Sequence, residues 1–101
     1  MKEYGNSVIV KKEDLVRLTE REISYYMRKV KDALIRDIMQ CMCKYDIKNP
    51  DIYLIHKSSN NGDMKFGWYI GDKLTLQKRV REEKWVIDSS VIYKPEHNII
   101  Q

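Results

Sequence analysis

Hydrophobic residues recur at helical spacing in the first half of the chain, at Ile23, Met27, Val30, Leu34, Ile38, Cys41 and Tyr45. Steps of three and four residues place these side chains on one stripe of an α-helix. Thr19 and Glu22 fit a capping box, and Asn49–Pro50 ends the helical region because the residue before proline is pushed out of the α conformation. The pattern predicts a helix from 20 to 45 after a short turn over 13–18, or else one helix from about 13 to 45.

Apolar and polar residues alternate in the second half of the chain, as they do in β-strands. Strands are predicted over 51–57, 64–70 and 85–93, and Val8–Val10 forms a short predicted edge strand. Asn61–Gly62 is a strong signal for a two-residue type I′ hairpin turn. Centring the hairpin on that turn places Ile55 opposite Trp68 and Tyr53 opposite Ile70.

The segment 74–85 permits two interpretations. A three-residue loop over 71–73 lets a strand place Leu74 and Leu76 on the same face as Trp68, and the hydrophobic pattern favours this strand. The charged stretch 78–84 also suits a helix over 74–85, which is the competing interpretation.

Together these elements predict an α+β protein in which one long helix packs on a four- to five-stranded antiparallel meander sheet, in the order β-α-β-β-β-β. Residues 1–101 form a single domain, with a flexible tail from about residue 95. One face of this sheet is rich in apolar side chains and receives the helix; its predicted members are Tyr53, Ile55, Phe66, Trp68, Ile70, Leu74, Leu76, Val80, Trp85, Ile87, Val91 and Tyr93.

The composition agrees with a folded domain, because 43% of the 101 residues are hydrophobic and 34% are charged. A single Ala stands against 12 Ile and 13 Lys, which indicates an AT-rich coding sequence, as in low-GC bacteria and their phages. The chain begins without an apolar leader and has no apolar run long enough for a membrane span. We therefore expect a cytoplasmic protein without membrane contact.

Candidate chemistry is sparse. Cys41 and Cys43 lie two residues apart on a helix, so they point in different directions and share neither a disulfide nor a metal ion. His56 and Asp88 could serve as a general base and its orienting carboxylate, but the meander places two strands between them, so we expect no direct contact. No nucleotide-binding or hydrolase motif occurs, and we expect no enzymatic activity, no cofactor and no metal.

A second apolar strip on the helix, formed by Ile35, Met39 and Met42, is not needed to cover the predicted sheet face. The N-terminal segment could cover this strip within the chain, and otherwise a protein partner or a second copy does so. We expect a small binding or regulatory protein that acts through protein–protein contacts, as a homodimer or on a target, using this helix half and the strand edges. An inhibitor from a phage or mobile element fits this description.

The alternative function is binding of single-stranded DNA or RNA on the other sheet face and the adjoining turn. The residues that would serve it are Lys65, Tyr69, Gln77, Arg79, Arg81 and Lys84. An ordinary solvated sheet face accounts for the same pattern, and a small enzyme is the third alternative. The formal net charge of +4 does not separate these alternatives, because opposite charges alternate along the helix and the turn.

Overall fold

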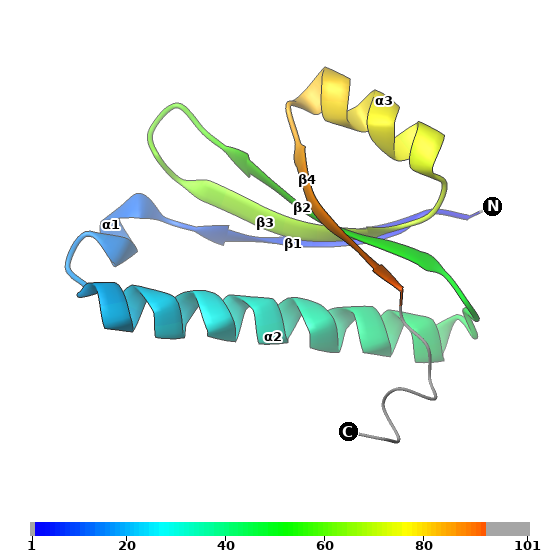
Figure 1. Ribbon diagram of the computed structural model, residues 1–101, viewed down its shortest axis with the longest axis horizontal. Helices are drawn as coiled ribbons and strands as arrows, with labels where there is room; N and C mark the ends of the chain where they lie inside the picture. Colours follow the sequence, from blue (N-terminus) through cyan, green and yellow to red (C-terminus); the bar gives the residue numbers. More distant parts are fainter. Residues whose placement is uncertain (1, 93–101) are drawn as a thin grey trace.

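The computed structural model describes residues 2–92, and the side chains of residues 2–88. A four-stranded sheet forms the middle layer, with a long helix on one face and a shorter helix on the other (Figure 1). In chain order the elements are β1 (Tyr4–Val10), α1 (Lys12–Leu15), α2 (Glu20–Lys44), β2 (Asp51–Ser58), β3 (Met64–Ile70), α3 (Lys73–Glu83) and β4 (Val86–Ile92).

The sheet has the strand order β1-β3-β2-β4, and each neighbouring pair is antiparallel. The predicted α+β class, with one long helix on an antiparallel sheet of four strands, is confirmed. Val8–Val10 belongs to β1, which lies at an edge as predicted. The tail predicted from about residue 95 and the strand position of Tyr93 lie outside the described residues.

Local hydrogen bonds set the two ends of α2. The backbone N–H of Glu22 donates to Thr19 Oγ1, and the Glu22 carboxylate accepts from the Thr19 backbone N–H, so the predicted capping box is confirmed. At the other end Asp46 has a φ of 51°, and the N–H of Ile47 donates to the Met42 carbonyl. These features form a Schellman motif, which stops the helix just before the predicted end.

The hairpin between β2 and β3 differs from the prediction by one residue. The Gly62 N–H donates to the Ser59 carbonyl, and Gly62, with a φ of 92°, is the residue with positive φ in this turn. A three-residue loop of this kind replaces the predicted type I′ turn, which needs positive φ at both central residues. Its register pairs Leu54 with Trp68 and Tyr53 with Tyr69, so the predicted partners of Ile55 and Tyr53 were wrong.

This shift divides the apolar residues between the two faces of the sheet, because side chains alternate along a strand. On the α2 side the buried core consists of Leu34, Ile38, Met42, Ile52, Trp68 and Ile70. On the opposite side it consists of Tyr53, Ile55, Tyr69 and Leu76, with Val80, Trp85 and Ile87 packed around them. The expectation of one apolar face was therefore wrong, and the second face needs a cover of its own.

Helix α3 provides that cover, so the strand prediction for 74–85 was wrong and the competing helix is correct. Asp72 caps the helix by accepting hydrogen bonds from the Thr75 backbone N–H and hydroxyl at 2.9 and 2.8 Å. Leu76 and Val80, four residues apart, pack on the sheet, whereas Leu74 is 75% exposed. A strand would have placed Leu74 and Leu76 on the same face.

Candidate functional site

The open edge of β1 is the most distinctive surface of the sheet. Its seven residues, YGNSVIV, contain no charged residue and no proline, and Gly5, Asn6 and Ile9 are exposed. Edge strands usually carry charges, prolines or bulges that discourage pairing with another chain. The opposite edge follows that rule, because β4 has a bulge at its charged residue Asp88. The β1 edge has none of these protections.

One side-chain hydrogen bond identifies which backbone groups face outward from β1. The Ser7 N–H donates to Asn6 Oδ1 at 2.9 Å and is therefore not used in the ladder with β3. Backbone groups alternate in direction along an antiparallel strand, so those of Gly5, Ser7 and Ile9 point to the open edge. Asn6 is held in turn by Asp37 on α2, which accepts from Asn6 Nδ2 at 2.9 Å.

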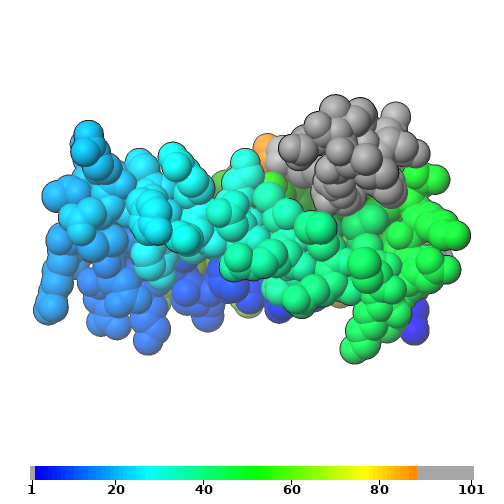
Figure 2. All heavy atoms as spheres, turned by 90° about the horizontal axis from the view of Figure 1, so that it is seen from below, coloured from blue at the N-terminus to red at the C-terminus, as the bar shows by residue number. Residues whose placement is uncertain are grey.

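A cleft flanks β1 on each face of the sheet. On the α3 side a cleft of about 440 Å³ lies between β1 and α3, and its lining includes Glu3, Ser7, Tyr69, Arg79 and Trp85. On the α2 side a cleft of about 450 Å³ is lined by β1 and α2 residues, among them Asp37 and Lys44. Seen from the α2 side, the dark blue atoms of β1 emerge beside α2 (Figure 2). Each cleft can receive alternate side chains of an added strand.

Two glycines keep the floor of the α3-side cleft low. A Cβ at Gly67 would lie 2.8 Å from the Asn6 carbonyl oxygen, and one at Gly5 would lie 3.1 Å from the Trp68 carbonyl oxygen. These contacts are with backbone atoms, which cannot move aside as a flexible side chain can. The indole N–H of Trp68, which contributes to both clefts, has no acceptor among the described residues.

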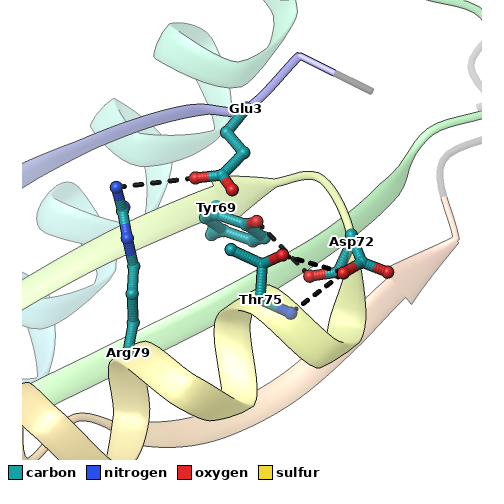
Figure 3. Close-up of polar contacts among 5 residues, drawn as sticks. All are labelled: Glu3, Tyr69, Asp72, Thr75 and Arg79. Atoms are coloured by element: carbon teal, nitrogen blue, oxygen red, sulfur yellow. Dashed lines mark hydrogen bonds and ion pairs between the residues drawn. The ribbon is translucent and has the colours of Figure 1, made fainter.

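A polar cluster fixes the α3 wall of this cleft (Figure 3). The Tyr69 hydroxyl donates to the Asp72 carbonyl at 3.3 Å, and Arg79 pairs with Glu3 at 3.5 Å. Burial raises the pKa of the Tyr69 phenol, and the negative charge of Glu3 raises it further. The hydrogen bonds from Thr75 lower the pKa of Asp72, so its carboxylate stays ionised at the start of the helix. The cluster joins β1, β3 and α3.

His56 and Asp88 form a contact that the sequence analysis did not expect. Because β4 pairs with β2 rather than with β3, the two residues lie on neighbouring strands, and His56 Nδ1 is 2.5 Å from Asp88 Oδ1. Asp88 is the extra residue of the β4 bulge, which turns its side chain toward the histidine. The pair belongs to neither β1 cleft, and no third acid, His or Cys joins it as a metal ligand among the described residues.

The structure divides the three residues of the predicted helix strip. Met42 is 9% exposed and belongs to the core, so its assignment to an exposed strip was wrong. Ile35 is half-buried, and Met39 is 41% exposed. One exposed methionine is too small a patch to make this part of α2 the main binding surface.

The residues of the nucleic-acid alternative do not form the predicted solvated sheet face, because α3 covers that face. Tyr69 is 2% exposed and offers no ring for base stacking. Gln77, Arg79 and Arg81 are exposed on α3, Lys84 follows the helix, and Lys65 lies half-buried on β3. Cations therefore gather on this side of the molecule without the aromatic platform.

Sequence reasoning recognised β1 as an edge but did not single out Gly5, Asn6, Ser7 or Ile9. The signal was present, because a strand-like run without charge or proline is unusual at an edge. None of the helices in the described residues is long and apolar enough to cross a membrane. Comparisons with protein-family models, with curated proteins and with solved structures find no match to this chain.

Proposed function

We propose that this chain is a non-enzymatic binding protein that acts through protein–protein contacts, and that its binding element is the open edge of β1. The observation that carries the proposal is an uncharged, proline-free edge strand with a cleft on each side. Added strands bind through main-chain hydrogen bonds, and flanking pockets select their alternate side chains.

The occupant that fits this edge best is β1 of a second copy. The outward backbone groups of Gly5, Ser7 and Ile9 are spaced evenly about Ser7, so two antiparallel β1 strands can pair around a two-fold axis at that residue. In this register Ile9 of one copy lies opposite Gly5 of the other. Ile9 is 62% exposed and Gly5 has no side chain, so a large apolar group meets an open floor.

The position of α2 also suits this pairing. Helix α2 packs against β1 and β3, about one strand spacing from the proposed axis. Strands lie about 4.8 Å apart, which places the two α2 helices about 10 Å from each other on one face of the joined sheet. Packed helices have interaxial distances of about 8–10 Å, so the two helices can contact without displacing either from its own sheet.

Asn6 controls access to the edge. Its side chain already accepts the hydrogen bond of the Ser7 N–H, and that bond must break when Ser7 pairs with Ser7 of a second copy. Asn6→Ala frees the Ser7 N–H in advance, and we expect this variant to dimerise several-fold more tightly, as for loss of one competing hydrogen bond of about 1 kcal/mol.

Sedimentation equilibrium tests the proposal directly. The wild-type chain should form dimers, and Ile9→Lys should be a monomer with an unchanged circular dichroism spectrum, because it places two lysines against the partner's glycine floor. Leu74→Lys is the matched control, since Leu74 is an exposed apolar residue on α3, away from β1, and its variant should remain dimeric.

A wild-type monomer at about 100 µM, well above the dissociation constants typical of specific dimers, would overturn the assignment of the occupant. An Ile9→Lys dimer would overturn the assignment of the edge. Failure of the control, with Leu74→Lys also monomeric, would move the interface to α3 and likewise contradict the proposal.

A further inference from the structure

We propose that a pocket beside the β2–β3 hairpin binds a phosphate-bearing ligand, held by Lys57, Lys65 and Lys84. This proposal is independent of β1 pairing, because it rests on different residues and a different ligand. The pocket measures about 470 Å³ and lies between the hairpin and the end of α3. Its volume falls within the range of about 300–1,000 Å³ found for small-molecule sites.

The first argument is a pair of like charges. Lys57 and Lys65 are direct cross-strand partners on the α3 side of the sheet, and both are half-buried. Their ammonium groups lie 4.7 and 5.7 Å from the centre of the same ring, that of Trp85. Like charges directly opposite each other destabilise a sheet, and one aromatic ring offsets two ammonium groups only in part.

The second argument is the lack of carboxylate partners. Neither lysine forms an ion pair within 4.0 Å with any acid among the described residues. Asp63 lines the pocket, but its two oxygens accept hydrogen bonds from the Lys12 N–H and the Asn61 side-chain amide. Glu83 is then the remaining acid against three lysines, so the pocket keeps a positive charge that an anion can neutralise.

The third argument is the backbone of Lys84. This residue ends α3 with a φ of 61°, in the left-handed region where glycine is the usual residue. Its side chain lines the pocket. A lysine in this conformation costs stability that a glycine would not. The cost places a third ammonium group at the pocket, and a bound phosphate would make use of it.

The test measures binding of three phosphate probes: pyrophosphate, ATP and a labelled ten-residue oligothymidylate. We expect saturable binding of at least one probe, which also identifies the source of the phosphate. Lys57→Gln with Lys65→Gln should weaken that binding about tenfold or more, since two charge-assisted contacts are lost. For the oligonucleotide the salt dependence should fall by about 1.4, at roughly 0.7 per phosphate contact on a single strand.

Two further variants separate ligand binding from folding. Lys29→Gln with Lys31→Gln removes the same charge from exposed positions of α2 and should leave binding unchanged. Lys84→Gly should raise the melting temperature, because glycine suits the positive φ, while it weakens phosphate binding. A purely structural lysine would not make stability and binding move in opposite directions.

Three results would overturn the proposal. The first is no binding of any probe at millimolar concentration. The second is equal binding by the wild type and the Lys57/Lys65 double variant. The third is an equal loss in the α2 control variant, which would show that only the net charge of the protein matters.

Discussion

The packing of α3 gives the sharpest test of the fold, through Leu74 and Leu76. Leu76 is 1% exposed among Tyr53, Ile55 and Tyr69, whereas Leu74, two residues earlier, is 75% exposed. In a strand the two side chains would share one face and one environment. In the helix they do not, so truncating each to alanine distinguishes the two structures.

The magnitude follows from the burial of each side chain. Leu76→Ala removes a fully buried isobutyl group and leaves a cavity under α3, which costs about 2–5 kcal/mol in protein cores. Leu74→Ala removes exposed atoms from a helix that accepts either residue, so its cost should stay within about 0.5 kcal/mol. At about 3 kcal/mol, Leu76→Ala would lower the melting temperature by roughly 12–24 °C in a domain of this size.

Urea unfolding at 25 °C, followed by circular dichroism, gives the two free-energy differences, and thermal unfolding provides the second measurement. The expected result is a large loss for Leu76→Ala beside an almost unchanged Leu74→Ala. Equal losses in the two variants would refute the helix and its packing, and would restore the strand interpretation of this segment.

Two other predictions concern pH and the strand contact. The carboxyls of Glu22 and Asp72 have a pKa below their ordinary values of 4.5 and 3.8, chiefly because Thr19 and Thr75 donate hydrogen bonds to them. Their contribution is therefore present at neutral pH and is lost as the pH falls below those ordinary values and through the lower folded pKa, so the acid-induced drop in the urea midpoint should be smaller in Glu22→Gln and Asp72→Asn; an unchanged slope would contradict the caps. For His56 and Asp88, a double-mutant cycle with alanine should give a coupling of about 0.5–1 kcal/mol, the low end for a half-exposed hydrogen bond, and zero coupling would place the two residues apart.

Local signals identified part of the binding edge but not its chemistry. The run Val8–Val10 marked an edge strand, yet the importance of Gly5 and Asn6 depends on neighbours far away in sequence. Asn6 is positioned by Asp37, and the space above Gly5 exists because α3 covers β2 and leaves β1 open. The sequence contains the residues of this site but not their spatial relation.

The sequence by itself determined the elements whose signals are local. The capping box of Thr19 and Glu22, the apolar stripe of α2 and the strands around Trp68 are set by neighbours in the chain, and the structure confirms each of them. Tertiary structure decided the pairing register, because a change of one residue in the hairpin moves every side chain to the other face. That shift created a second apolar face, and only its burial makes α3 a better solution than a fifth strand. The strand order then brought His56 to Asp88, since a contact between non-consecutive strands has no local signature.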